Sequence, residues 1–324
     1  MFTKIPTTLA DGTASTKNKP DAIVGGSFPE SGWDPNLRAA TFAAAFATIP
    51  SWATITDPGH WYGAGYGVSE GAVEAPKKGE DGKYVPNEAD AALTAERLKT
   101  ELQDLWNYVY KERQIRDAEI SAQADDFSAY WGNLLVCSAT IRPSLWLLIL
   151  SGVQIGGLVA AYHKSNYKRP RPAQAWLPIA PSIATPGHPA YPSGHATQAH
   201  LISLFMQLVA PELSEACDAL ARRIAGNREI AGVHYRSDTL AGEWSARKIF
   251  DLLCGHSPVT IDQDTVVSGL VAAFNDLVAA ARSEWRPDFV RPQVIETDFD
   301  AALKVANHID GDVFKDPPRT LANK

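Results

Sequence analysis

The stretch from residue 164 to residue 238 carries three short motifs, which read KSNYKRPRP (164–172), PSGH (192–195) and NREIAGVHYRSD (227–238). They supply cationic side chains, two histidines, a serine, a glycine and a carboxylate. Cationic groups neutralise the oxygens of a tetrahedral anion, and a histidine can accept a group that is transferred. The motifs therefore predict an oxyanion site, and they contain no recognisable set of metal ligands.

The composition is that of a soluble globular protein, because 45% of the 324 residues are hydrophobic and 21% are charged. A net charge of -7 argues against a nucleic-acid-binding protein, which needs a basic face. No acidic residue lies between Asp126 and Glu212, whereas five basic ones do: Arg142, Lys164, Lys168, Arg169 and Arg171. This asymmetry either concentrates anions or reflects buried helices, in which charges of either sign are rare.

The N-terminus has no apolar run of the kind found in a secretory signal, and the three cysteines form no paired motif. Both features predict a cytoplasmic protein with buried thiols. Residues 145–162 are nearly apolar but are interrupted by polar residues and glycines. This run is at the lower limit for crossing a membrane, so we expect a buried core helix and no membrane partner.

Apolar residues recur at helical spacing along most of the chain, and no internal repeat or strand pattern accompanies them. The sequence therefore predicts an all-α, single-domain helical bundle. We expect an irregular N-terminal extension packed on the core (1–90), a helical catalytic domain (91–285) and a C-terminal tail (286–324). The expected helices are 36–48, 88–123, 127–139, 144–162, 196–209, 213–231, 238–253 and 265–281. Recurring prolines exclude a regular helix from 169–192.

The second motif is predicted to lie at a helix N-terminus, since a proline precedes it and an apolar run follows. Unpaired amides at such an end favour an anion. Gly194 permits close approach of the backbone, Ser193 adds a hydroxyl, and His195 then lies beside the anion. Taken alone, the motif is equally well explained as a helix cap.

The third motif places His234 and Asp238 one helical turn apart, on one face. A carboxylate so placed can accept the proton of one imidazole nitrogen and leave the other nitrogen free to attack. Arg228 can reach the same pocket across a break at Gly232. Without the other motifs, a surface His–Asp pair would be the better explanation.

The first motif contributes Lys164 and Arg171, which flank a turn that enters the proline-rich segment. A guanidinium binds two oxygens of a phosphate in a fork, whereas an ammonium acts as a point charge. Lys168 and Arg169 are expected to belong to a solvated face.

The three motifs in this order resemble those of the superfamily of type 2 phosphatidic acid phosphatases and vanadium-dependent haloperoxidases. Its pattern is Lys-x6-Arg-Pro, then Pro-Ser-Gly-His, then Ser-Arg-x5-His-x3-Asp. The match is complete except for Asn227, which stands where the family usually has serine, and an amide can still donate a hydrogen bond. Flanking stretches such as AQADDFSAYWGNLL look like those of soluble bacterial members of the phosphatase branch.

The resemblance implies an all-helical bundle around the oxyanion and a role for each motif residue. His234 would be the nucleophile that forms a phosphohistidine, oriented by Asp238, and His195 would act as acid and base. The residues expected to bind phosphate or vanadate are Lys164, Arg171, Ser193, Gly194 and Arg228. No metal is implied, except that His234 would bond to vanadium if vanadate were the cofactor.

Two activities remain open at this point, because the same pocket serves both branches. His188 lies seven residues before His195, where bromoperoxidases carry a histidine, although soluble phosphatase-like members also have Pro-Gly-His-Pro there. Ala161 stands where haloperoxidases tend to have a large or charged side chain. Both residues are candidates for a substrate or halide pocket. A degenerate binding protein is the third alternative, and the presence of both catalytic histidines argues against it.

We favour a phosphatase without a cofactor that hydrolyses soluble phosphomonoesters. The alternative is a haloperoxidase that uses vanadate as its cofactor and oxidises bromide or iodide with hydrogen peroxide. The expected partner is a phosphorylated small molecule or vanadate, with no nucleic acid and no membrane. Apolar helices could form a homodimer face, but they could equally form the core.

Overall fold

The computed structural model describes residues 33–49, 52–59, 88–255 and 265–285. Every regular element in these ranges is a helix, and they contain no strand, which confirms the predicted all-α class. The predicted C-terminal tail and much of the predicted N-terminal extension lie outside these residues. The domain boundaries therefore stay predictions.

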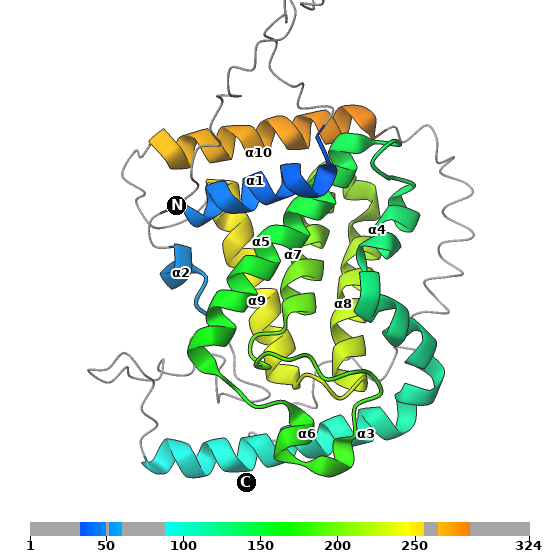
Figure 1. Cartoon of the computed structure of the whole chain (residues 1–324), viewed down its shortest axis with the longest axis vertical. Coiled ribbons are helices and arrows are strands. Elements are labelled where there is room, and N and C mark those ends of the chain that lie inside the picture. The colour runs from blue at the N-terminus through cyan, green and yellow to red at the C-terminus, as the bar shows by residue number, and fades with distance from the viewer. Residues whose placement is uncertain (1–32, 50–51, 60–87, 256–264, 286–324) are drawn as a thin grey trace, which may run out of the picture. The chain divides into compact units, whose positions relative to one another are not determined.

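Four helices form the bundle that carries the site: α5 (Pro143–Tyr167), α7 (Gly194–Val209), α8 (Ser214–Ile230) and α9 (Arg236–Leu253). They lie alongside one another, and α7 packs against the other three (Figure 1). The backbones of α5 and α7 lie very close, because a Cβ at Gly152 would be 2.8 Å from the Ile202 side chain. Two apolar helices at this distance bury each other's sides and exclude water from the centre of the bundle.

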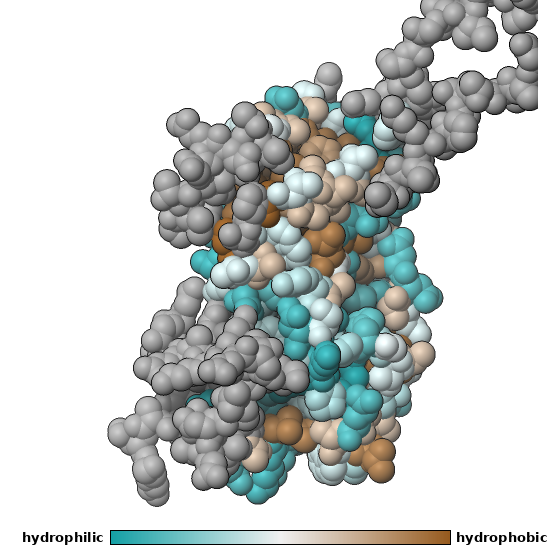
Figure 2. Space-filling view, turned by 60° about the vertical axis from the view of Figure 1, so that its left-hand side comes forward, coloured by the Kyte–Doolittle hydropathy of each residue, from teal (hydrophilic) through white to brown (hydrophobic). Residues whose placement is uncertain are grey.

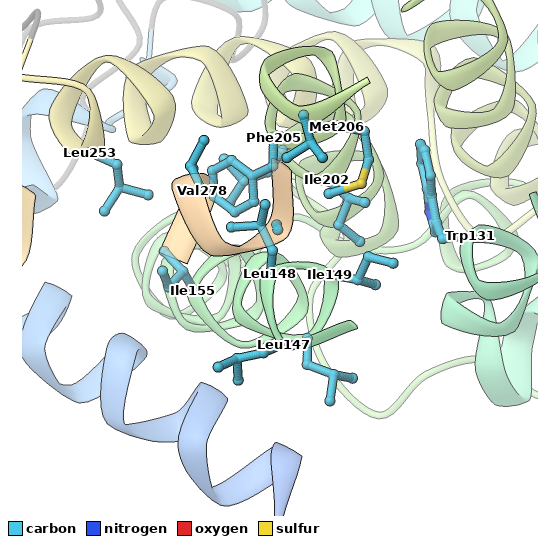
Figure 3. Close-up of a cluster of buried hydrophobic side chains, with 14 of the residues drawn as sticks. Trp131, Leu147, Leu148, Ile149, Ile155, Ile202, Phe205, Met206, Leu253 and Val278 are labelled. Atoms are coloured by element: carbon cyan, nitrogen blue, oxygen red, sulfur yellow. The ribbon is translucent and has the colours of Figure 1, made fainter. Parts of the chain in front are cut away.

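The main core lies where α1 (Pro35–Ala47), α10 (Thr265–Glu284) and α4 (Ser128–Leu135) pack against the bundle. Figure 3 shows buried side chains from α4, α5, α7, α9 and α10 converging there, with Phe205 and Leu148 among them. The helix expected at residues 36–48 is present as α1, whose N-terminus is capped by the Asp34 carboxylate. This core holds the bundle helices together, and it does not include the motif residues.

The long helix α3 (Glu88–Asp126) lies apart from this main core and contacts α8 and the short 3-10 helix η3 (Leu177–Ile179). Figure 1 shows α3 crossing beneath the bundle, at the end where the motifs lie. Two small apolar clusters, around Ile120 and around Leu105, pack it in place. Helix α3 also forms hydrogen bonds with Arg169, His195 and Arg228.

The apolar helix α5 is the main part of the stretch Pro143–Ala175, which by length and composition alone could cross a membrane. Of its most apolar window, 61% is buried inside the protein. Figure 2 shows hydrophobic and hydrophilic residues interspersed across the described part of one face. Residues 145–162 therefore lie in a helix whose most apolar part is largely buried, as expected for a core helix.

Some predicted helix ends differ from the structure. Helix α5 continues to Tyr167 rather than ending at residue 162, so Lys164 lies in its last turn and not in a loop. The helix ends there because Arg169 precedes Pro170 and a residue before proline disfavours the helical conformation. The four-residue helix α6 (Pro172–Ala175) and η3 lie within the proline-rich segment, since proline fits the first turn of a helix.

Candidate active site

The three motifs meet at one end of the bundle and line a cavity of about 880 Å³. Lys164 comes from the last turn of α5 and Arg228 from the last turn of α8. His195 lies in the first turn of α7, and His234 lies two residues before α9. The motif residues on the cavity wall are Lys164, Gly194, His195, Arg228 and His234. The convergence expected from the sequence is therefore present.

The starts of α7 and α9 are fixed to each other through backbone contacts. The amide of Ser193 donates a hydrogen bond to the carbonyl of Asp238 at 2.9 Å. Gly242 of α9 faces the same point, where a Cβ would lie 2.8 Å from both the Ala196 Cβ and the Ser193 carbonyl oxygen. A glycine is required because any side chain would push the two helices apart. The starts of the two helices, beside which His195 and His234 lie, are thereby held together.

His234 and Asp238 are paired as predicted, although His234 lies outside the helix. Helix α9 begins at Arg236, and the Asp238 carboxylate reaches back to accept a hydrogen bond from the Tyr235 amide at 3.0 Å. The same carboxylate oxygen lies 3.0 Å from the His234 Nδ1. His234 lies outside the helix because Asp238, in the first turn of α9, caps the helix, and the residues before the cap are not helical.

The contacts of His234 define which of its nitrogens carries the proton. Its Nε2 lies 3.0 Å from Nη1 of Arg171, and a guanidinium can only donate. Nε2 therefore accepts, and Nδ1 carries the proton that it donates to Asp238. Burial and then the nearby Lys164 hold the pKa of His234 well below its usual value. The ring is neutral, with its lone pair on the nitrogen that faces the cations.

The three motif cations are buried and are satisfied mainly by backbone carbonyl groups. Lys164 Nζ donates to the carbonyls of residues 189 and 190, both at 2.8 Å, and Arg171 Nη1 donates to that of residue 233 at 2.6 Å. Arg228 Nη2 donates to the Ile120 carbonyl of α3 at 2.7 Å. The Nε atom of Arg228 is buried without a partner among the described residues. Donors that remain available in this way suit an anion.

Burial lowers the pKa of each of these cations. The pKa of Lys164 falls to about 7, with Arg171 as the second cause, and those of Arg171 and Arg228 fall to about 10. The nearby carboxylate of Asp238 acts in the opposite direction and raises the pKa of Lys164 and of Arg171. An anion bound among them would offset their mutual repulsion.

His195 lines the cavity beside α3. Its Nε2 lies 3.2 Å from the carbonyl of Gln123, which can only accept, so Nε2 carries the proton. Burial and then Arg228 lower the pKa of His195 to about 4. The ring is therefore neutral near pH 7, and an anion that neutralised the cations around it would raise its pKa.

Ser193 and Gly194 form the N-terminus of α7, as expected. The Ser193 Oγ caps the helix by accepting a hydrogen bond from the Ala196 amide at 3.3 Å, and Gly194 lies on the cavity wall. Ser193 is fully buried. Its hydroxyl proton remains free to be donated, so a contact between Ser193 and an anion stays a prediction.

Asn227, the one departure from the family pattern, is not directed at the anion site. Its amide group donates to Glu119 at 3.0 Å and to Gln123 at 2.8 Å, and its oxygen accepts from Arg116 at 3.3 Å. All three partners lie on α3. Asn227 therefore joins α8 to α3.

Arg169 is buried, so the expectation of a solvated side chain was wrong for this residue, whereas Lys168 is exposed. Nη1 of Arg169 donates to Asp238 at 2.7 Å, and Nη2 donates to Glu101 of α3 at 2.8 Å. No local pattern distinguishes Glu101, because it is one of many charged residues on a long helix. The pairing could not be inferred from spacing, since Glu101 and Arg169 belong to distant elements.

The two candidate pocket residues, Ala161 and His188, both lie on the cavity wall. Nη2 of Arg171 lies 3.0 Å from the Nδ1 of His188. His188 therefore extends the polar contacts of Arg171 to the rim of the cavity. Within the described ranges, no group of three or more histidines, cysteines or acidic residues could hold a metal ion.

The described residues thus form a helical protein with a cavity lined by two histidines and two buried cations. Residues 144–246 match the model of the PAP2 superfamily. The decaprenylphosphoryl-5-phosphoribose phosphatase of Mycolicibacterium smegmatis is 30% identical over 124 residues. That similarity covers 36% of this chain, and the chain spans 64% of the relative's length.

Proposed function

We propose that the protein is a phosphatase that hydrolyses soluble phosphomonoesters through a phosphohistidine at His234, without a metal. The observation that carries the proposal is the fixed state of His234: Nδ1 donates to Asp238, and Nε2 presents its lone pair beside Arg171. This is the arrangement that a nitrogen nucleophile requires at a phosphorus atom held by cations. The PAP2 match and the phosphatase name of the relative support the same class.

The proposed reaction has two steps. In the first, His234 Nε2 attacks phosphorus, the bond to the ester oxygen breaks, and protonated His195 gives its proton to the departing alcohol. In the second, His195 accepts a proton from water, which attacks the phosphohistidine and releases phosphate. Lys164, Arg171 and Arg228 neutralise the three equatorial oxygens, where charge stabilisation contributes most to phosphoryl transfer.

The bound anion explains how His195 can serve as an acid despite its low pKa. Arg228, Lys164 and Arg171 each lower the pKa of His195. A phosphate dianion offsets these charges and raises the pKa of the ring toward its ordinary value. Substrate binding would therefore load the proton that the first step requires.

Vanadate fits the same residues, with His234 Nε2 as its ligand, and would supply peroxide-dependent halide oxidation when bound. One observation keeps that alternative in view: His188 lies on the cavity wall and contacts Arg171. We retain the phosphatase as the proposal and place the protein in the cytoplasm. Whether it forms a homodimer is a separate question that size-exclusion chromatography answers. The relative's name indicates a prenyl-linked phosphoribose for that protein, so a lipid-linked phosphate is the competing substrate class.

The test measures hydrolysis of p-nitrophenyl phosphate by protein treated with a chelator, alongside His234→Asn and Arg223→Gln. We expect hydrolysis by the wild type, inhibition by vanadate, loss of turnover in His234→Asn and retained sulfate binding. Arg223→Gln should keep its activity, because Arg223 pairs with Glu119 away from the cavity. Bromide oxidation by vanadate-loaded protein without phosphate hydrolysis would refute the proposal.

A further inference from the structure

Asp238 needs more than His234 to hold it as a carboxylate at the centre of the site. Its side chain is fully buried, and a buried charge is costly unless it is paired. One oxygen is shared by His234 and the Tyr235 amide. The other accepts a hydrogen bond from Arg169 at 2.7 Å, which forms a buried ion pair. Arg169 therefore contacts the side of Asp238 that faces away from the nucleophile.

Arg169 is itself held in one orientation by groups from two other elements. Its Nη2 donates to Glu101 of α3 at 2.8 Å, and its Nη1 also donates to the Ser237 hydroxyl at 2.7 Å. The guanidinium carbon lies 3.9 Å from the centroid of the Tyr235 ring. A planar cation that is forked between two carboxylates and stacked on a ring has little freedom to turn.

Glu101 completes the arrangement by fixing the start of α9. One of its oxygens accepts from the Ser237 amide at 2.7 Å, and the other accepts from the Ser237 hydroxyl at 2.9 Å. Carboxylates near a helix N-terminus are favoured because the unpaired amides there carry partial positive charge. The same carboxylate thus holds both Arg169 and the turn that carries His234.

We propose that Arg169, held by Glu101 of α3, is a positioning residue that keeps the Asp238 carboxylate aligned with the nucleophile His234. The proposal rests on the proposed phosphatase function, because it assigns an indirect role in the same reaction. Arg169 touches neither phosphate nor leaving group in this scheme. It sets where the Nδ1 proton of His234 is held and at which pH the ring remains neutral.

The test compares three variants of the full chain. Arg169→Gln removes the charge, Arg169→Lys keeps the charge without the fork, and Arg223→Gln removes a different arginine–glutamate pair between α8 and α3. Each is assayed for kcat and KM with p-nitrophenyl phosphate from pH 4 to 9, and circular dichroism confirms folding. The pKa and tautomer of His234 are read directly by NMR of 15N-labelled histidine.

Loss of the Arg169 cation, which lies beside the Asp238–His234 pair, raises the pKa of His234. For Arg169→Gln we therefore expect kcat to fall roughly 10- to 100-fold with little change in KM, as for residues that support a catalytic group. The acid limb of kcat should move up by about one pH unit. Arg169→Lys should restore the acid limb and only part of kcat, and Arg223→Gln should behave as the wild type.

A kcat of Arg169→Gln within about threefold of the wild type, with an unmoved acid limb, would overturn the proposal. So would an equal change in Arg223→Gln, which would indicate a general loosening of α3. If the wild type hydrolyses no phosphomonoester, the proposed function fails, and the His234 pKa by NMR decides the positioning role by itself. An unchanged His234 pKa and tautomer in Arg169→Gln would then refute it.

Discussion

The low pKa of Lys164 predicts that anion binding weakens steeply above neutral pH. Burial, with Arg171 as the second cause, lowers this pKa to about 7. An anion that binds only when Lys164 is protonated can therefore bind about 90% of the protein molecules at pH 6 and about 1% at pH 9. The ratio corresponds to about a 90-fold loss of affinity, or roughly 2.7 kcal/mol. Because the pKa of Lys164 is lowered in the folded protein, Lys164 must take up a proton when the anion binds above pH 7.

Sulfate is the suitable ligand for this measurement, because its charge stays constant across the range whereas that of phosphate does not. Its dissociation constant is measured by isothermal titration calorimetry from pH 6 to pH 9, in two buffers with different ionisation enthalpies. We expect uptake of about one proton per sulfate at pH 8.5. Lys164→Arg keeps its charge and should remove most of the pH dependence, whereas Lys164→Gln should bind weakly at every pH.

A change of less than about threefold in wild-type affinity between pH 6 and pH 9 would contradict this role of Lys164. The same pH dependence in Lys164→Arg as in the wild type would contradict it as well. In that case a group other than Lys164 would govern the titration.

Two further predictions concern stability. Gly242→Ala should lower the free energy of unfolding in urea by about 1–3 kcal/mol, because its Cβ would lie 2.8 Å from Ser193 O and the Ala196 Cβ. Gly269→Ala is the matched control: nothing lies within 4 Å of its Cβ, so it should stabilise α10 by about 0.5–1 kcal/mol, and equal effects would contradict the close approach. The pKa of His195 is lowered to about 4, so the unfolded chain binds protons first as the pH falls below 6.5. The partly exposed ring should cost up to about 2.5 kcal/mol of stability by pH 4.5, and His195→Gln should flatten this dependence in pH-resolved thermal unfolding.

The sequence predicted the helical class and the convergence of the motifs because both are written in local patterns. Apolar spacing identified the main bundle helices, and the order of Lys164, His195 and His234 identified the site. His234 was expected to share a helical face with Asp238, whereas α9 begins only at Arg236. In the structure, the carboxylate reaches that histidine by capping the helix instead.

The contribution of α3 could not have been predicted from the same patterns. His195 and Arg228 bond to backbone carbonyls of α3, and a carbonyl leaves no trace in the sequence. Arg169 looked like a solvated residue because neither its direction nor its partner Glu101 is fixed by spacing. Asn227 has the same explanation: which face of α8 meets α3 depends on tertiary packing.

The wall of the cavity has two parts, which come from different segments of the chain. One part carries motif residues from α5, α7, α8 and the turn before α9. The remaining wall comes largely from the end of α3 and from residues 182–189, which include Ile183 and Pro186. Replacing side chains on that wall would alter the fit of the alcohol portion of a substrate without moving either histidine. Substrate fit would thus vary with residues outside the three motifs, while the motif residues stay in place.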